Sequence, residues 1–402
     1  MPLVPALQPF RTTIFATMSA LAASTGAINL GQGFPDTDGP PGMLEAAQQA
    51  IRDGHNQYPP GAGIPALREA ISAARLRDRG QTFDPDTEVL VTVGATEAIA
   101  AAVIALVQTG DEVLMLDPHY DSYPAVVAMA GARHVSVPLH SDGSAGRFAL
   151  DLDAMAAAIT PRTKMILLNT PHNPTGTVLT RDELTGIADL AISHDLLVVT
   201  DEVYEYLTFD DTEHVPIGTL PGMAERTLTV SSAGKTFAAT GWKIGWVCGP
   251  APLVAAVRAA KQFLTYAGGA PFQPAVAYAL EHEMQWVQGL RNSLQHKRDR
   301  LCEGLSVAGF GVHRPQGTYF VVTDIRPLTT AMGRPADGMA FCLDLPALAG
   351  VVAVPQQVFH DNPDDGKPFV RFAFCKQDAV IDEAAGRRGR MSRPAGTTGE
   401  HR

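Results

Sequence analysis

The stretch Thr227-Leu228-Thr229-Val230-Ser231-Ser232-Ala233-Gly234-Lys235-Thr236 joins a short apolar run to a turn of small residues that carries a lysine. Two earlier segments have the same build. Leu196-Leu197-Val198-Val199-Thr200 runs into Asp201-Glu202-Val203-Tyr204, and Met165-Ile166-Leu167-Leu168 runs into Asn169-Thr170-Pro171-His172-Asn173-Pro174-Thr175-Gly176. Short continuous apolar runs of this kind indicate buried strands of a parallel sheet. Ligands bind at the carboxyl ends of such strands, so we expect the three polar clusters to form one site.

The polar residues of these clusters are the types that a pyridoxal phosphate site requires. The amine of Lys235 can form a Schiff base with the cofactor aldehyde and then act as general acid and base. The carboxylate of Asp201 can pair with the pyridinium nitrogen and keep it protonated. Tyr204 and Asn173 can donate hydrogen bonds to the ring phenolate oxygen. A single lysine after a strand is usually a solvated surface residue, and a single aspartate at a strand end is usually a helix cap. The occurrence of all these residues in order at strand ends favours the cofactor site.

Several motifs resemble those of the fold-type I, class I/II aminotransferases. They are Asn-Pro-Thr-Gly at 173–176, Asp-Glu-Val-Tyr at 201–204, Ser-Ser-Ala-Gly-Lys at 231–235 and Thr-Gly-Trp-Lys-Ile-Gly-Trp at 240–246. The opening Asn-Leu-Gly-Gln-Gly-Phe-Pro-Asp at 29–36 is similar to the kynurenine/methionine aminotransferase-like branch. The resemblance runs from about residue 10 to about residue 384. It implies an α/β enzyme with pyridoxal 5'-phosphate as cofactor, a mostly parallel seven-stranded sheet flanked by helices in a large domain, and a smaller α+β domain.

The resemblance adds further cofactor residues. Gly94-Ala95-Thr96 stands where a strand turns into a helix, and the free N–H groups and helix dipole there favour a phosphate. In the family the positions of Ser232 and Lys243 also hold the phosphate, although many relatives have Arg at the second. Tyr120 is expected to stack on the pyridine ring. Tyr58 matches a tyrosine that reaches the phosphate of the neighbouring subunit, which implies a homodimer with shared active sites.

Substrate residues follow from the same resemblance. Arg371 alternates with apolar neighbours in Phe369-Val370-Arg371-Phe372-Ala373-Phe374 and matches the arginine that clamps substrate carboxylates. Gly33 lets the backbone approach the same carboxylate. Phe15 and Tyr266 match side-chain pocket positions, although an aromatic residue at position 15 is equally plausible in the core. The expected substrates are an amino acid and a 2-oxo acid.

Three functions are compatible with these residues. The first is a ping-pong aminotransferase, and the segments 261–263 and 268–274 resemble actinobacterial enzymes acting on N-succinyl-L,L-2,6-diaminopimelate with 2-oxoglutarate. Kynurenine, methionine or glutamine transamination is the alternative substrate choice. The second function is a pyridoxal phosphate-dependent cysteine-conjugate β-lyase. The third is a non-catalytic regulator, which we disfavour because residues 1–42 leave no room for a DNA-binding domain and the lysine is intact.

Composition and charge limit the expected binding partners and the expected cellular compartment of the protein. The net charge of -11 argues against nucleic acid, where a basic patch is expected. Four cysteines show no metal or redox spacing, so we expect no metal site and a cytoplasmic location. The beginning of the chain lacks the pattern of a signal peptide. The longest apolar stretch, 98–107, is too short to span a bilayer and indicates a buried helix.

The chain of 402 residues is long enough for two domains. We expect a large cofactor domain at 43–286, a small domain formed by 1–42 and 287–385, and a disordered tail at 386–402, where glycines and a proline interrupt the helical pattern. Helices are expected at 10–25, 43–53, 65–79, from about Glu97 onwards and through most of 272–308. Further strands are expected at 89–93, 112–116, 318–324, 350–354 and 368–374.

Overall fold

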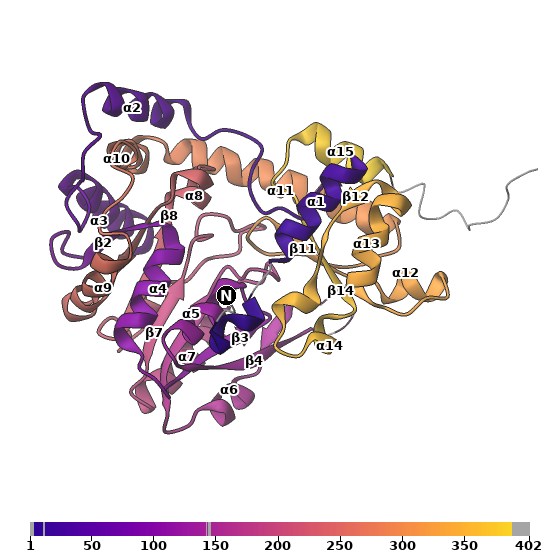
Figure 1. The fold of residues 1–402 in the computed structure, drawn as a ribbon, viewed down its shortest axis with the longest axis horizontal. Coiled ribbons are helices and arrows are strands. Elements are labelled where there is room, and N and C mark those ends of the chain that lie inside the picture. The colour runs from indigo at the N-terminus through magenta and orange to yellow at the C-terminus, as the bar shows by residue number, and fades with distance from the viewer. Residues whose placement is uncertain (1–3, 11–12, 142, 144–145, 388–402) are drawn as a thin grey trace, which may run out of the picture.

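Two main sheets and their helices form the two parts of the molecule seen side by side in Figure 1. The computed structural model describes residues 4–10, 13–141, 143 and 146–387. The larger sheet has the order β2-β9-β8-β7-β6-β3-β4-β5. Its strands are β2 Val89–Val93, β3 Glu112–Asp117, β4 Arg133–Ser141, β5 Phe148–Leu150, β6 Thr163–Asn169, β7 Leu197–Asp201, β8 Thr227–Ser232 and β9 Ile244–Cys248. The five strands from β8 to β4 are parallel, which confirms the predicted mostly parallel sheet. With the short antiparallel β5 at its edge, the sheet has eight strands among the described residues instead of the expected seven.

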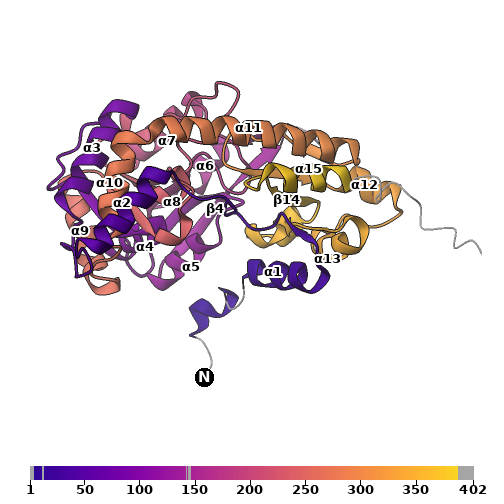
Figure 2. The same ribbon diagram turned by 90° about the horizontal axis from the view of Figure 1, so that it is seen from above.

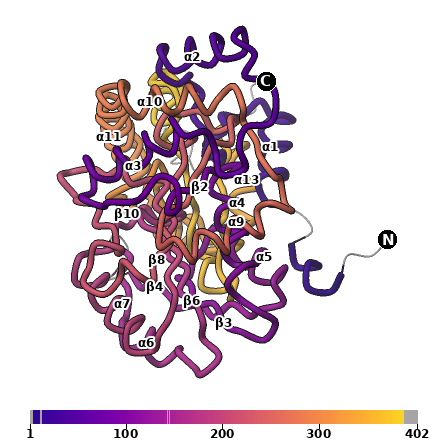
Figure 3. Tube along the Cα trace, turned by 90° about the vertical axis from the view of Figure 1, so that its left-hand side faces the viewer, coloured from indigo at the N-terminus to yellow at the C-terminus, as the bar shows by residue number. Residues whose placement is uncertain are grey.

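Helices cover both faces of this sheet because its strands are apolar on both sides. Met165 and Leu167 of β6 pack in the same core cluster as residues of α4, whereas Ile166 and Leu168 pack with residues of α7. A third core cluster lies under α2, α3 and α10, which Figure 3 shows grouped together. The helices of this part are α2 Pro41–Arg52, α3 Pro65–Arg79, α4 Gly94–Leu106, α5 Ser122–Met129, α6 Leu152–Ala158, α7 Arg181–Ser193, α8 Ala233–Thr236, α9 Ala251–Leu264 and α10 Phe272–His282.

The smaller sheet is antiparallel and has the order β10-β11-β14-β13. Beside it, β1 pairs with β12 in parallel, which attaches the beginning of the chain to this part of the molecule. The strands are β1 Ile28–Asn29, β10 Gly311–His313, β11 Phe320–Asp324, β12 Val351–Val352, β13 Val354–Pro355 and β14 Phe369–Ala373. The helices are α1 Ile14–Thr25, α11 Met284–Val307, α12 Arg326–Ala331, α13 Gly338–Ala349, α14 Pro363–Gly366 and α15 Asp378–Gly386. The long α11 connects the two parts of the molecule (Figure 2).

Several expected boundaries need correction. The helix expected to begin near Glu97 begins at Gly94, whose φ of +73° only glycine adopts without strain. The helical stretch at 272–308 is divided at Glu283 into α10 and α11. Gly386, where the tail was expected to begin, is the last residue of α15, and residues 388–402 of that tail lie outside the described residues. Among the described residues, no helix is both long and apolar enough to cross a membrane.

Candidate active site

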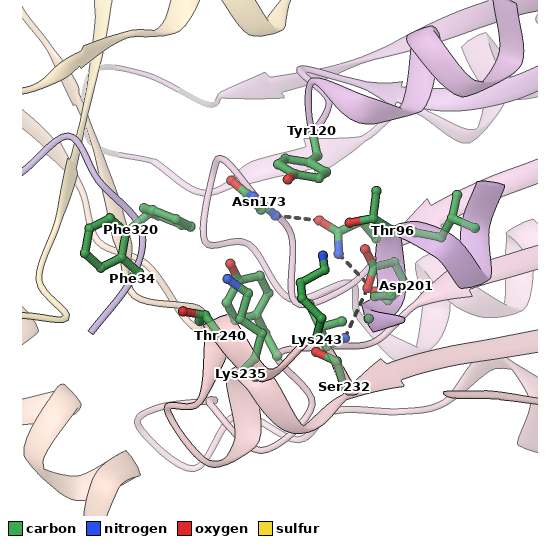
Figure 4. Close-up of a pocket in the computed structure, with 18 of the residues that line it drawn as sticks. Phe34, Thr96, Tyr120, Asn173, Asp201, Ser232, Lys235, Thr240, Lys243 and Phe320 are labelled. Atoms are coloured by element: carbon green, nitrogen blue, oxygen red, sulfur yellow. Dashed lines mark hydrogen bonds between the residues drawn. The ribbon is translucent and has the colours of Figure 1, made fainter. Parts of the chain in front are cut away.

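A cavity of about 300 Å³ opens where β6, β7 and β8 end, between the two sheets. Register explains why the predicted clusters meet, since Asn169 pairs with Asp201 and Asp201 with Val230 in neighbouring parallel strands. Most of the predicted site residues line this cavity: Phe15, Gly33, Ala95, Thr96, Tyr120, Asn173, Asp201, Tyr204, Ser232, Lys235, Lys243 and Arg371. In Figure 4, Tyr120 and Asn173 lie on one side of the cavity and Lys235, Lys243 and Ser232 on the other.

Asp201 is buried at the carboxyl end of β7. Burial raises the pKa of its carboxyl group to about 6, although hydrogen bonds favour the ionised form. The hydroxyl of Tyr123 donates to Oδ2 at 2.7 Å, and the N–H of Val203 donates to Oδ1 at 3.2 Å. A buried carboxylate held by two donors is a suitable partner for a protonated ring nitrogen.

Lys235 is joined to the opposite wall through a tyrosine that the sequence did not single out. Its Nζ donates to the hydroxyl of Tyr319 at 2.7 Å, and that hydroxyl donates to the carbonyl oxygen of Gly33 at 2.6 Å. Burial lowers the pKa of Lys235 to about 8. The ring of Tyr204 lies edge-on to Tyr319, with centroids 5.2 Å apart, and completes this wall. The lysine amine is therefore positioned and is partly neutral near neutral pH.

The start of α4 fits a phosphate group. A Cβ added to Gly245 of β9 would lie 2.5 Å from the carbonyl carbon of Gly94, so only glycine lets these two backbones approach so closely. A Cβ added to Gly94 would lie 3.0 Å from Nζ of Lys243, which places that ammonium group at the beginning of the helix. Ser232 and Thr96 line the same cavity with hydroxyl groups. Helix N–H groups, a cation and two hydroxyls are the donors that bind phosphate.

Arg371 lies on β14 with 1% of its surface exposed. Its Nη1 donates to Oδ1 of Asn173 at 2.9 Å, while Nε and Nη2 are buried and have no hydrogen-bond partner among the described residues. The guanidinium carbon lies 4.0 Å from the ring centroid of Phe320 and 4.8 Å from that of Phe359. Burial lowers the pKa of Arg371 to about 10, so it remains charged at neutral pH. Two free donors on a fixed, charged fork fit a carboxylate.

A chain of amides links the two ends of the cavity. Nδ2 of Asn169 donates to the carbonyl oxygen of Asp201 at 2.9 Å, and Oδ1 of Asn169 accepts from the N–H of Asn173 at 2.7 Å. Because Oδ1 of Asn173 accepts from Arg371, its Nδ2 group is available as a donor. The predicted donor role of Asn173 toward a ring oxygen is therefore compatible with this geometry.

Tyr58 and Tyr266 are not brought into the cavity of their own chain. They contact each other, with ring centroids 5.6 Å apart, and are 82% and 50% exposed. Phe263, nearby in sequence, is 85% exposed. Exposed aromatic side chains of this kind are typical of a surface that another chain covers. The predicted roles of Tyr58 and Tyr266 in a site would require a neighbouring subunit.

Sequence reasoning missed Tyr123, Tyr319 and Phe359. Tyr123 stands three residues after Tyr120 in a segment that was already of interest, so its spacing offered a local signal. Tyr319 lies far along the chain from Lys235, and only the packing of the smaller sheet against the larger one brings them together. Phe359 meets Arg371 through the tertiary packing of the smaller part, and apolar periodicity does not show such contacts.

The comparisons with known proteins agree with this site. A sequence model of the family Aminotransferase class I and II matches residues 25–387. The chain belongs to this family; it is a pyridoxal phosphate-dependent aminotransferase that moves an amino group between an amino acid and a 2-oxo acid.

Individual relatives narrow the resemblance. The chain is 58% identical, over 94% of its length and 96% of the relative's, to Probable N-succinyldiaminopimelate aminotransferase DapC of Mycobacterium tuberculosis. It is 39% identical to methionine aminotransferase of Escherichia coli, over 96% and 98% of the two chains, which confirms the predicted branch. A solved structure of N-succinyldiaminopimelate aminotransferase from Mycobacterium tuberculosis matches with a TM-score of 0.93 and 57% identity, covering 97% of this chain and all of that one.

Proposed function

We propose that the chain transfers the amino group of N-succinyl-L,L-2,6-diaminopimelate to 2-oxoglutarate, as part of amino-acid biosynthesis. The observation that carries this substrate is the 58% identity to the mycobacterial relative over nearly the whole length of both chains. The cavity is compatible with the amino-acid end of this substrate, because Arg371 offers two unpaired donors to an α-carboxylate. Fold and cofactor alone do not determine a substrate, so the proposal rests on this similarity.

Lys235 would carry the proton transfer, and Asp201 would keep the cofactor ring protonated. When bound, pyridoxal phosphate supplies an aldehyde that condenses with amines and a ring that accepts the electron pair of the substrate α-carbon. The amine of Lys235 would take the proton from the substrate α-carbon and deliver it to the cofactor carbon that carried the aldehyde, which a lowered pKa permits near neutral pH. Asp201 would hold a proton at the ring nitrogen. Tyr123 keeps Asp201 oriented through its 2.7 Å hydrogen bond.

Arg371 and Gly33 position the substrate. The fork of Arg371 would bind the α-carboxylate. Gly33 lines the same cavity and packs against Phe320 so closely that an added Cβ would lie 2.4 Å from that ring, so a side chain at position 33 would displace the cavity wall. Tyr120 would cover the cofactor ring, and Asn173 and Tyr204 would donate hydrogen bonds to its oxygen. The residues that would hold the phosphate are Ala95, Thr96, Ser232 and Lys243. Phe15, whose ring centroid lies 5.5 Å from the guanidinium carbon, lines the side-chain end of the cavity.

A substrate panel tests this proposal. N-succinyl-L,L-2,6-diaminopimelate, kynurenine, methionine and glutamine should each be tried as donor with 2-oxoglutarate, and kcat/KM compared. We expect the first donor to exceed the others by about tenfold or more, a margin of about 1.4 kcal/mol. A higher value for any other donor would overturn the substrate, while the aminotransferase activity itself would stand.

The aromatic lining of the cavity favours one alternative. Phe15, Phe34 and Phe320 give the side-chain end an apolar character that also suits methionine or kynurenine. The same panel distinguishes this alternative. Pyruvate release from a cysteine conjugate, measured without an oxo acid, tests the β-lyase, which should be slower than transamination.

The active species is a homodimer in which Tyr58 completes the site of the partner subunit. The exposed cluster of Tyr58, Phe263 and Tyr266 supports this assembly, because large exposed aromatic groups mark interfaces. Tyr58 contributes to phosphate binding there, and Tyr266 to the side-chain pocket. Both side chains lie outside the cavity of their own chain, as shared sites require.

Hybrid dimers test the shared site. Lys235→Ala subunits mixed with Tyr58→Phe subunits should regain activity, because one site of each hybrid carries both changes and the other carries neither. Tyr278→Phe, which removes another partly exposed hydroxyl, provides a matched control and should be active alone. Lack of recovery, with subunit exchange verified by mass, would refute sharing.

The two parts of the molecule act as domains, a large one at 43–286 and a small one formed by 1–42 and 287–385. The pairing of β1 with β12 and the core cluster that holds Met18, Leu30 and Phe372 together support the inclusion of the N-terminal segment in the small domain. The enzyme acts in the cytoplasm. Four free, buried cysteines are compatible with a reducing compartment.

A further inference from the structure

A cluster of imidazole and carboxylate groups joins the two parts of the molecule outside the active-site cavity. His119 follows β3, His134 lies on β4, and Asp361 follows the short helical turn at 356–359 of the other part. Nε2 of His119 lies 3.2 Å from Oδ1 of Asp361, and Nε2 of His134 lies 2.9 Å from the same oxygen. The three ligand atoms all lie within 4.8 Å of one another. Two imidazole nitrogens therefore converge on one carboxylate oxygen.

Contacts that do not use these three ligand atoms hold the cluster in place. Nδ1 of His360 pairs with Oδ1 of Asp117 at 2.6 Å, and the N–H of Asp361 donates to Oδ2 of Asp117 at 2.9 Å. The N–H of His119 donates to the carbonyl oxygen of Phe359 at 2.9 Å. The backbones that carry the ligands are thus fixed to each other, which is the support that a preformed metal site needs.

The surroundings of the cluster leave room for a fourth ligand. The side chain of His119 is 7% exposed, whereas those of His134 and Asp361 are 30% and 39% exposed, so one side of the cluster is open to solvent. Nδ1 of His119 has no hydrogen-bond partner in the described part of the chain. Because no described acceptor meets a proton on Nδ1, the proton of the metal-free neutral imidazole lies on Nε2, facing Asp361, and metal binding through Nε2 would transfer it to Nδ1.

We propose that His119, His134 and Asp361 bind a divalent transition-metal ion, with Zn²⁺ as the best match. Zn²⁺ favours imidazole and carboxylate ligands, and bonds of about 2.0–2.2 Å in a tetrahedron place ligand atoms about 3.4 Å apart. The observed separations of 2.9 and 3.2 Å from the carboxylate oxygen need only a small expansion. The protein supplies three ligands, and a water molecule from the exposed side supplies the fourth.

A second group shows why this cluster is the better candidate. Glu202, Glu205 and His214 also lie close together and are fully buried. However, Nη1 of Arg75 lies 2.7 Å from Glu205 and its Nη2 lies 3.1 Å from Glu202. The guanidinium group already supplies the positive charge there. The His119 cluster contains no such built-in cation among its ligands.

The ion would brace the two parts of the molecule close to the substrate site. Two of its ligands belong to the part of the molecule that contains the larger sheet, since His134 lies on β4 and His119 follows β3. The third, Asp361, follows Phe359 by two residues. The Phe359 ring lies 4.8 Å from the guanidinium carbon of Arg371. Bound metal is therefore expected to stabilise the folded enzyme by linking the two parts, without entering the reaction.

Zinc binding to the tag-free holoenzyme tests the proposal. After dialysis against chelator and then buffer, Zn²⁺ titration by calorimetry should show one site per chain. His134→Ala and Asp361→Asn should each weaken that site by about 100-fold or more. His194→Ala removes an exposed imidazole elsewhere and should leave binding unchanged. The visible band of the bound cofactor, recorded during the titration, should also stay unchanged.

Thermal unfolding gives an independent measurement. Zn²⁺ should raise the Tm of the wild type and of His194→Ala, but not that of His134→Ala or Asp361→Asn. Absence of a zinc site in the wild type would overturn the proposal. Equal binding by all four proteins, or a cofactor band that shifts in proportion to bound zinc, would also overturn it, because the ion would then lie elsewhere.

Discussion

Replacing Arg371 with lysine keeps a positive charge in the cavity but removes the planar fork. In the structure Nη1 is engaged by Asn173, and Nε and Nη2 are the free donors for a carboxylate. A lysine ammonium is a single point of charge on a flexible chain. It cannot hold the carboxylate at two points and keep Asn173 in place. Substrates should therefore bind less tightly and with poorer orientation of the α-carbon.

The size of the effect follows from the contacts. Losing one of two charge-assisted hydrogen bonds costs about 1.5–3 kcal/mol, which is about 10- to 150-fold in kcat/KM. The site is fully buried, so solvent does not reduce this loss. Releasing Asn173 and misplacing the reacting bond adds to it. We expect kcat/KM to fall between about tenfold and about a thousandfold.

The measurement is the rate of each half-reaction, followed by cofactor absorbance after mixing with the amino acid or with the oxo acid. Both rates should fall together, because one carboxylate clamp serves both substrates in turn. Arg314→Lys changes an arginine whose side chain is 51% exposed and should have no effect. A fall confined to one substrate, or no fall, would make Arg371 structural and would refute the reasoning.

Four further predictions concern Lys235, Asp201 and Tyr319. Lys235→Ala should abolish transamination and the visible band of the bound cofactor while circular dichroism stays unchanged; substantial activity would contradict its role. Asp201→Asn should lower kcat by roughly a hundredfold or more with the cofactor still bound. A decrease in kcat of less than about tenfold would contradict the role of Asp201 as partner of the ring nitrogen. Capture of pyridoxal phosphate by the apoenzyme needs a neutral lysine, so its rate should rise with pH and level off above about 8. Tyr319→Phe removes a hydrogen-bond acceptor that favours the protonated amine, so this midpoint should move to lower pH, and an unchanged midpoint would contradict the contact.

The parts of the fold that sequence predicts well are those with a strong local signal. One proline at the first helical position and a glycine directly after the last one define α3, and five consecutive apolar or β-branched residues define β2. The start of α4 was placed too late because a glycine ahead of it suggested a turn. The break at Glu283 was missed because apolar periodicity continues on both sides of it. Local patterns indicate that an element exists more reliably than where it ends.

The residues of the candidate site also differ in whether a local sequence pattern indicates them. Lys235, Asp201 and Asn173 were accessible because each follows a strand, and parallel strands carry their ends to one edge. Tyr319 lies 84 residues from Lys235 and 286 from Gly33, so no local pattern joins them. Tyr58 and Tyr266 were expected in the site, yet their position can be assigned only with a second subunit. Contacts between distant segments, within or between chains, are what sequence patterns leave undetermined.

Two series of hydrogen bonds in the site connect the larger sheet with the smaller one. One series runs from Asp201 through Asn169 and Asn173 to Arg371, and it crosses from the larger sheet to the smaller one. The other runs from Lys235 through Tyr319 to Gly33 and crosses in the same way. The proposed ring partner, Asp201, and the proposed base, Lys235, lie at the ends of strands of the larger sheet, whereas the proposed carboxylate clamp, Arg371, lies on the smaller one. A change in the distance between the sheets would therefore alter both substrate binding and the position of the base. A substitution that shifts one sheet should thus affect both properties.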